Sequence, residues 1–375
     1  MQNTTKYVGL DVSKELIAVA VADEGGDPRF LGNIRNTPEA VRKTLTKIGE
    51  SACLEVCYEA GPTGYGLYRQ LKQLGISCLV AAPSLIPRRP GDRVKTDRRD
   101  ALRLAQLLRA KELTAVWVPT EDDEALRDLV RARQDAKEDL LAARHRLSKF
   151  LLRNNIMPPM GVRSWSTKHR QWLGSLKWDR RAQQITFQEY WHAIDEIEER
   201  IKRLESEIHA QATDSGHAPV IQALQTLRGV AEVTAVSLVA EVGQFSRFRS
   251  PKQLMAYAGL VPREYSTGGS RWQGGITKTG NTHLRFAITE SAWSYRYKPA
   301  LKGEIRKRQE GKSPQAQSVA WKAQDRLHRK YSKMLSRGKN SGVAITAVAR
   351  ELLGFVWAIA CEVEHRAKES EQTSA

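Results

Sequence analysis

Hydrophobic and polar positions divide the first third of the chain into short elements. Five apolar runs are rich in β-branched and aliphatic residues, which favours strands: 6–12, 15–22, 30–34, 54–58 and 76–81. One helix is predicted to begin at Thr37-Pro38, with Thr37 as its N-cap, and another carries Leu67, Leu71 and Leu74 on one face. Three strands followed by a strand–helix–strand unit predict a mixed α/β sheet.

The pattern changes to helical spacing from Glu121 onward. Apolar residues three and four positions apart predict a helix to about residue 154. A heptad seam follows at Ile194, Ile197, Ile201, Leu204 and Ile208. Two long helices joined by a basic, tryptophan-rich insert at 162–182 predict an antiparallel hairpin or an oligomeric coiled coil, acting as a spacer or dimer arm.

These changes predict an α/β region followed by α-helical regions. An α/β domain is expected at 1–118, a helical coiled-coil arm at 119–215 and a mainly helical C-terminal domain at 216–365. A polar tail at 366–375 is expected to be disordered. A chain of 375 residues is too long for one ordinary core, which agrees with two or three domains.

Charge indicates the partner more than the fold. The formal net charge is +18 at pH 7, which makes nucleic acid the leading candidate, with a basic protein of other function as the alternative. Residues 302–340 hold 12 lysines and arginines against three acids. That one-signed excess favours a phosphate-tracking surface over an ordinary solvated helix face.

Cysteine spacing and hydropathy predict a reduced, cytoplasmic and soluble protein that is not associated with a membrane. No two cysteines form a C-x-x-C pair, which argues against a zinc ribbon or a disulfide scaffold. Residues 1–6 lack the apolar core of a signal peptide. The apolar stretch 343–361 contains Arg350 and Glu351, so we expect a buried helix and not a membrane span.

Four carboxylates are candidates for a metal site. Asp11 interrupts an apolar strand, where a charge needs a partner, and Glu59 ends another apolar run. Asp97 and Asp100 are three residues apart and share a helix face. We expect the four to hold Mg²⁺, with Mn²⁺ as the alternative, against nucleic-acid phosphate. For Asp97 and Asp100 the competing interpretation is an exposed helix with solvated ion pairs.

The segment 262–284 is the second candidate site. Glycines cluster between Gly268 and Gly280 and let the backbone approach a ligand closely. Ser266 lies just before two of these glycines, which leave its hydroxyl accessible. A serine beside metal ions could attack phosphorus and form a covalent phosphoserine–DNA link. The alternative is a flexible polar loop between helices.

Basic residues extend the predicted nucleic-acid surface. The stretch 227–235 has the pattern of a helix–hairpin–helix turn, in which Gly229 would bring backbone amides to a phosphate, although an ordinary turn between helices has the same pattern. The other basic candidates are Arg88, Arg89, Arg93, Arg98, Arg99, Arg263, Arg271, Lys278, Arg285, Arg306, Lys307 and Arg308.

Several motifs resemble those of insertion-sequence family 110, the DEDD transposases. The N-terminal ones are Gly9-Leu10-Asp11-Val12-Ser13-Lys14, Tyr58-Glu59-Ala60-Gly61-Pro62-Thr63-Gly64 and Lys95-Thr96-Asp97-Arg98-Arg99-Asp100-Ala101. The stretches 258–269 and 275–285 resemble that family's C-terminal transposase domain. The likeness spans roughly residues 6–300, with the motifs in the family's order.

The resemblance implies an RNase H-like N-terminal domain similar to Holliday-junction resolvases, a coiled-coil arm, and a C-terminal domain that supplies a nucleophilic serine. By residue matching, the metal acids are Asp11, Glu59, Asp97 and Asp100, and the nucleophile is Ser266. The resemblance also implies donor and target DNA as substrates, a noncoding bridge RNA that pairs with both, and self-association to dimers or tetramers.

Other functions stay open from the residues alone. A junction-resolving or RNase H-type nuclease without covalent chemistry would use the acids and not Ser266. A sugar-kinase- or actin-like ATPase also has an Asp after its first strand, but it needs a second glycine-rich loop after a later strand. A non-catalytic RNA-binding protein would need the charge alone. Within the serine segment, Thr267, Ser270 and Tyr265 are alternative nucleophiles.

Overall fold

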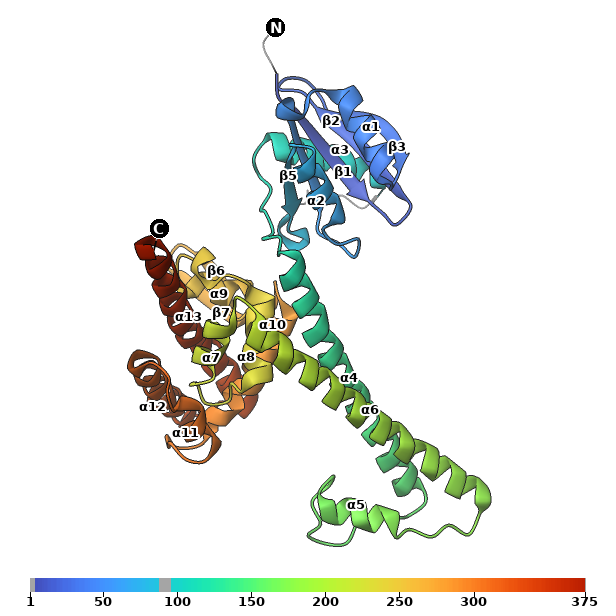
Figure 1. Ribbon diagram of the computed structural model, residues 1–375, viewed down its shortest axis with the longest axis vertical. Helices are drawn as coiled ribbons and strands as arrows, with labels where there is room; N and C mark the ends of the chain where they lie inside the picture. Colours follow the sequence, from blue (N-terminus) through green and yellow to red (C-terminus); the bar gives the residue numbers. More distant parts are fainter. Residues whose placement is uncertain (1–3, 88–95, 375) are drawn as a thin grey trace. The chain divides into compact units, whose positions relative to one another are not determined.

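The computed structural model describes residues 4–87 and 96–374, without the side chains of Arg271 and of 370–374. Contacts divide the chain into two compact units, Met1–Pro119 and Thr120–Ala375. The elements of the first unit, blue to cyan in Figure 1, are β1 (Lys6–Val12), β2 (Leu16–Ala22), β3 (Arg29–Arg35), α1 (Pro38–Ile48), β4 (Leu54–Glu59), α2 (Gly66–Gln73), β5 (Ser77–Ala81) and α3 (Asp97–Arg109).

The first unit is built on one mixed sheet with the strand order β3-β2-β1-β4-β5. β2 runs antiparallel to β1 and β3, whereas β1, β4 and β5 are parallel to one another. Side chains alternate between the faces of a strand. Val8 and Leu10 enter the core beneath α1 and α2, and Tyr7 packs on the opposite face, against α3. The mixed α/β sheet expected from the apolar pattern is therefore confirmed.

Gly9 allows α3 to lie directly on β1. A Cβ atom at this position would be 2.3 Å from the carbonyl oxygen of Ala101 and 2.4 Å from the backbone nitrogen of Ala105. Both are backbone atoms of α3, so they cannot move aside as a flexible side chain would. Ala18 and Ala20, on the neighbouring strand β2, also have small side chains and continue the close contact with α3.

We expect Gly9→Ala to destabilise the first unit by about 1–3 kcal/mol or more, since the methyl group forces α3 away from the sheet. Urea unfolding of the purified protein measures the change. Gly25→Ala is the matched control, because a Cβ there meets no atom within 4 Å. Equal unfolding midpoints for the two variants would contradict the close approach of α3.

The second unit is mainly helical and contains one β-hairpin. Its elements are α4 (Glu121–Arg153), α5 (Thr167–Gly174), α6 (Arg181–Asp214), α7 (Ala218–Leu224), α8 (Glu232–Val242), α9 (Pro251–Tyr257), β6 (Pro262–Thr267), β7 (Ser270–Ile276), α10 (Thr282–Ala292), α11 (Glu304–Gln309), α12 (Pro314–Ser336) and α13 (Ser341–Ser374).

The helices α4 and α6 form a long antiparallel pair (Figure 1). Arg133 pairs with Glu205, whereas Arg144, further along α4, pairs with Glu198, earlier on α6. The expected seam is confirmed, because Ile194, Ile201 and Ile208 are buried. The tryptophans of the insert are partly buried against the same pair, at Trp165, Trp172 and Trp178. They contribute to packing here, as core residues do.

The last helix, α13, is the main support of the C-terminal core. Its side chains Val348, Leu352 and Val356 are fully buried among the other helices of the unit. Within the described residues, Ser341–Glu369 is long and apolar enough to cross a membrane, but half of its most apolar window is buried inside the protein. The helix continues to Ser374, so residues 366–374, expected to be disordered, are helical.

Candidate functional site

The four predicted metal acids belong to one face and one end of the N-terminal sheet. Glu59 follows Tyr58, which is in register with Leu10, so Glu59 is the neighbour of Asp11 across the parallel pair β1–β4. Side chains alternate between the two faces along a strand. Asp11 therefore lies on the same face as Gly9, and Glu59 lies on the same face as Cys57. Gly9 and Cys57 both pack against α3, so both acids lie on the one face of the sheet that α3 covers.

The direction of α3 brings the other two acids to the same end. Arg109, at the end of α3, donates to the carbonyl oxygens of Asp23 and Gly26, which follow the end of β2 that pairs with Tyr7, whereas Gly9 faces the backbone nearer the start of the helix. The helix therefore runs opposite to β1, and its first turn, with Asp97 and Asp100, lies toward the Asp11 end of the strand. Asp11 and Asp100 are half-buried, and Asp97 and Glu59 are exposed.

The four carboxylates lie toward the same end of the sheet, but they are not close enough together to coordinate one metal ion. Among residues 4–87 and 96–374, no three Asp, Glu, His or Cys side chains lie close enough to hold one metal ion. Like charges repel one another unless a cation offsets them. The donor chemistry nevertheless fits, since carboxylate oxygens are the protein ligands that Mg²⁺ and Mn²⁺ take.

Ser266 lies on a β-strand and not in the loop between helices that the glycines suggested. It is exposed on β6, and its Oγ donates a hydrogen bond to Glu264 Oε1 at 2.9 Å. Gln273, opposite Glu264 on β7, donates from Nε2 to Glu264 Oε2 at 3.1 Å. The serine hydroxyl therefore has a carboxylate beside it, which is oriented by a third side chain.

Strand alternation separates Ser266 from the three alternative nucleophiles. Tyr265 and Thr267 are its immediate neighbours on β6 and so lie on the other face of the hairpin. Tyr265 packs on Trp272, with ring centroids 5.6 Å apart, and Ser270 is the cross-strand partner of Thr267. Ser266 is thus the hydroxyl residue of β6 that shares a face with Glu264.

Two glycines join the root of the hairpin to the helices around it. A Cβ at Gly259, where φ is +65°, would be 2.3 Å from the carbonyl oxygen of Thr279. A Cβ at Gly280, where φ is +102°, would be 2.2 Å from that of Tyr257. The backbone nitrogen of Asn281 donates to Tyr257 O at 2.9 Å. The two ends of the hairpin are therefore held together by backbone contacts that no side chain could enter.

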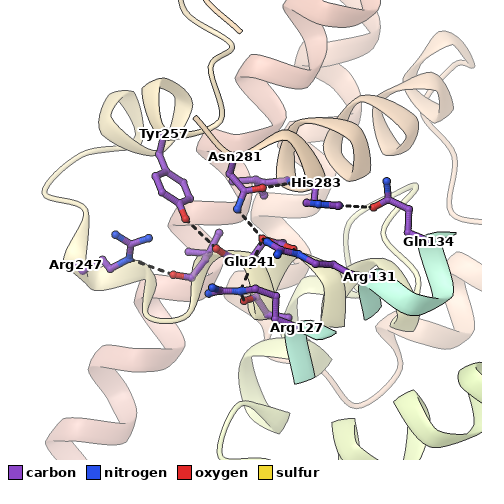
Figure 2. Close-up of polar contacts among 11 residues, drawn as sticks. Arg127, Arg131, Gln134, Glu241, Arg247, Tyr257, Asn281 and His283 are labelled. Atoms are coloured by element: carbon purple, nitrogen blue, oxygen red, sulfur yellow. Dashed lines mark hydrogen bonds and ion pairs between the residues drawn. The ribbon is translucent and has the colours of Figure 1, made fainter. Parts of the chain in front are cut away.

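A buried carboxylate that the sequence analysis missed lies beside this root (Figure 2). Glu241 is 1% exposed; it accepts hydrogen bonds from Arg131 at 2.8 and 2.9 Å and from Asn281 Nδ2 at 2.6 Å. Asn281 Oδ1 in turn accepts from Leu284 N at 2.8 Å and caps α10. Burial by itself raises the pKa of Glu241, but the hydrogen bonds from Arg131 and Asn281 outweigh burial and lower it. The signal in the sequence was a single acid near the end of an apolar helix.

Several of the basic candidates contact other residues of the chain. Arg285 donates to Ala258 O at 2.9 Å, Arg308 donates to Val230 O, and Lys307 pairs with Glu304 at 3.0 Å. Arg98 lies over the ring of Phe30 at 5.4 Å. Arg99, Arg263, Lys278 and Arg306 are exposed. Arg88, Arg89 and Arg93 lie outside the described residues, as does the side chain of Arg271.

Gly229 has a packing role in the structure. A Cβ there would be 2.4 Å from the carbonyl oxygen of Ser291, so the glycine permits the end of α10 to approach the turn before α8. The structure thus gives a packing reason for the glycine that the sequence pattern assigned to phosphate binding.

Two protein-family models match the chain. The model described as "Transposase" (DEDD_Tnp_IS110) matches residues 8–156, which include the sheet and its carboxylates. The model described as "Transposase IS116/IS110/IS902 family" matches residues 221–305, which include the serine hairpin.

Curated relatives cover most of the chain. It is 47% identical to "Putative transposase y4qE" of Sinorhizobium fredii (strain NBRC 101917 / NGR234) over 359 residues, 95% of this chain and 88% of that protein. It is 32% identical to "Transposase for insertion sequence element IS1533" of Leptospira borgpetersenii over 337 residues, 89% of this chain and 97% of that protein. It is 27% identical to "Pilin gene-inverting protein" of Moraxella bovis over 271 residues, 72% of this chain and 67% of that protein.

The two matched regions contain the carboxylate end of the sheet and the serine hairpin, in that order along the chain. With relatives of this identity along almost its whole length, the chain belongs to the IS110/IS116/IS902 family of transposases, which bind DNA and catalyse its cleavage and strand transfer.

Proposed function

We propose that this transposase cuts and rejoins donor and target DNA through a covalent link between Ser266 and a DNA phosphate. The hydrogen bond from Ser266 Oγ to Glu264 Oε1 is the observation that carries the proposal, because a base stands beside the attacking oxygen. Attack forms the Oγ–P bond and breaks the bond from phosphorus to the leaving sugar oxygen. The hydroxyl proton passes to Glu264, and the leaving oxygen takes a proton from water.

In this proposal Asp11, Glu59, Asp97 and Asp100 hold Mg²⁺ or Mn²⁺. When bound, the ion stabilises negative charge on the scissile phosphodiester. The carboxylate-only donor set and the common end of the sheet support this assignment. The strand order β3-β2-β1-β4-β5, with an antiparallel β2, supports the RNase H-like fold that the resemblance implies.

We further propose that a noncoding bridge RNA guides the reaction and that the protein works as a dimer or tetramer in the cytoplasm. The net charge of +18 supports the binding of nucleic acid, which includes an RNA of this kind. The long α4–α6 pair supports an arm for self-association.

Covalent trapping with peptide mapping tests the proposal. The protein is mixed with RNA transcribed from the noncoding DNA of its element, labelled donor and target DNA, and Mg²⁺, and is then denatured. We expect a protein–DNA adduct that requires the metal. Trypsin cuts after Arg263 and Arg271, so the adduct maps to one peptide, and fragmentation assigns it to Ser266.

Other results would change specific parts of the proposal. Cleavage without an adduct would indicate a hydrolytic nuclease and remove the serine step. An adduct on Tyr265 would replace the nucleophile. Equal adduct formation without RNA would remove the guide from the mechanism.

A further inference from the structure

A cavity of about 550 Å³ at the root of the hairpin is lined by cations from three elements. Arg263 comes from β6, Lys278 follows β7, and Arg350 comes from α13. Apart from Thr346, the rest of the wall is apolar or glycine, including Ile276 and Val343, and no acid is among the described residues that line it. The volume is in the range of sites that bind small ligands or single nucleotides.

Two other cavities of the second unit have a different charge. The cavity between α4 and α10, of about 390 Å³, includes Glu138, Glu241 and Glu290 among its basic residues. The cavity beside the start of α4, of about 770 Å³, includes Asp122, Asp123 and Glu207. Of these three cavities, the hairpin-root cavity is the one whose charged lining residues are all cations.

The three cations are not balanced by neighbouring acids. Within the described residues, no hydrogen bond or ion pair is recorded for the side chains of Arg263, Lys278 or Arg350. Glu351, next to Arg350 in the sequence, accepts from Arg326 at 3.1 Å and also pairs with Lys330. Like charges that converge without a counterion repel one another, and an anion between them removes that cost.

The backbone at Lys278 supports a role for its side chain. Its φ is +57°, a left-handed conformation that disfavours residues with a Cβ and is commonest for glycine. Its backbone nitrogen donates to Gly259 O at 3.0 Å, which holds the residue in this conformation. A strained backbone at a residue that lines a cavity agrees with a functional role for its side chain.

We propose that this cavity binds a phosphate of the DNA strand on which the transposase acts, through Arg263, Lys278 and Arg350. Arg263 and Ser266 are three residues apart on β6, about 10 Å at the rise of a strand. The register of the hairpin shifts between Pro262 and Glu264, so Arg263 is an unpaired residue and does not follow the alternation that places Tyr265 and Thr267 on the face opposite Ser266. A phosphate in the cavity would therefore be a near neighbour, along the same strand, of the phosphate that Ser266 attacks. The inference rests on the proposed function only for the role of Ser266.

Binding measurements separate the two ideas. In a Ser266→Ala background, which removes the covalent step, the affinity for duplex DNA and for single-stranded RNA is measured across a range of salt concentrations. We expect Arg350→Gln and Lys278→Gln each to weaken DNA binding about tenfold at low salt. Neutralising the cavity should lower the slope of log K against log salt by about one, as for the loss of one phosphate contact.

Lys278→Gly and Arg203→Gln are the decisive variants. The first keeps the backbone conformation, so we expect an unchanged melting temperature together with the same loss of DNA affinity. The second removes an exposed arginine of α6 and should leave the affinity near that of the parent. The assignment would be overturned if Lys278→Gly bound DNA as tightly as Arg203→Gln, or if Lys278→Gly lost affinity only for RNA. Adduct formation by the parent protein, which retains Ser266, tests the proposed function separately.

Discussion

Ser266→Ala should reduce covalent adduct formation by at least about 10³-fold, because no hydroxyl remains to form the Oγ–P bond, and binding and charge stabilisation could support only hydrolysis by water. DNA affinity and the melting temperature should stay close to those of the parent. The side chain is exposed, and its recorded hydrogen bond is to Glu264, which keeps the bond from Gln273. Single-turnover trapping with labelled DNA measures the rate.

The neighbouring hydroxyl residues supply matched controls. Tyr265→Phe, Thr267→Ala and Ser270→Ala remove hydroxyls from the opposite face of the hairpin, so each should keep adduct formation within a few-fold of the parent. Loss of the adduct in one of these variants and its survival in Ser266→Ala would assign the chemistry to that residue. Gln273→Ala should give an intermediate rate, since it removes one of the hydrogen bonds that orient Glu264 beside the serine.

Glu241→Ala should destabilise the second unit by about 3–5 kcal/mol. The side chain of Glu241 is 2% exposed, and its removal leaves the Arg131 guanidinium without the two hydrogen bonds that it now makes. Arg127, at 3.9 Å from the same carboxylate, loses its counterion as well. Urea unfolding, followed by a signal from the second unit, measures the loss.

A glutamate on the same helix is the control for this effect. Glu232 is more exposed and pairs with His209 at 2.8 Å on the surface. Exposed pairs contribute about 0–1 kcal/mol, so Glu232→Ala should change stability little. If the two variants unfolded at the same urea concentration, the Glu241 network would contribute no more to stability than an exposed ion pair does.

The stabilisation by Glu241 should depend on pH. Its pKa is lowered in the folded protein, because the hydrogen bonds from Arg131 and Asn281 outweigh burial. Its contribution is therefore fully present above the ordinary glutamate pKa of about 4.3 and is lost as the pH falls through the lower folded pKa. The difference in unfolding free energy between the parent and Glu241→Gln should be constant near neutral pH and should narrow below about pH 4.

Loss of Glu241 should also slow the covalent reaction of Ser266. Asn281 both donates to Glu241 and caps α10, and its backbone closes the root of the hairpin that carries Ser266. The network in Figure 2 therefore connects α4 and α8 to the end of the serine hairpin. A variant that loses it should form adduct more slowly even at temperatures where the protein remains folded.

The basic extension has a structural role besides any contact with nucleic acid. Ala320, Ala323 and Leu327 of α12 are buried in the core of the second unit. Arg326 and Lys330 pair with Glu351 on α13. Deletion of 302–340 would therefore expose that core. Substitution of exposed residues such as Lys322 and Lys333 is the better test of a phosphate-tracking surface.

The sequence by itself determined the elements whose signals are local. The strands of the sheet and the seam Ile194–Ile201–Ile208 follow from apolar spacing, because a strand or helix face has a fixed period. The resemblance to the transposase family also rests on short contiguous motifs, such as the residues around Asp11 and Glu59. That the two acids are neighbours across β1 and β4 follows only from the register of those strands.

Only the tertiary structure decided the features that depend on distant residues. Arg131 and Glu241 are 110 positions apart, and Arg350 reaches the hairpin from the last helix. The glycines around Ser266 suggested a loop, whereas cross-strand pairs such as Tyr265–Trp272 make it a hairpin. Gly9 looks like any strand glycine until α3 lies upon it. Local sequence fixes backbone periodicity and capping, but packing partners are chosen by which surfaces bury one another best.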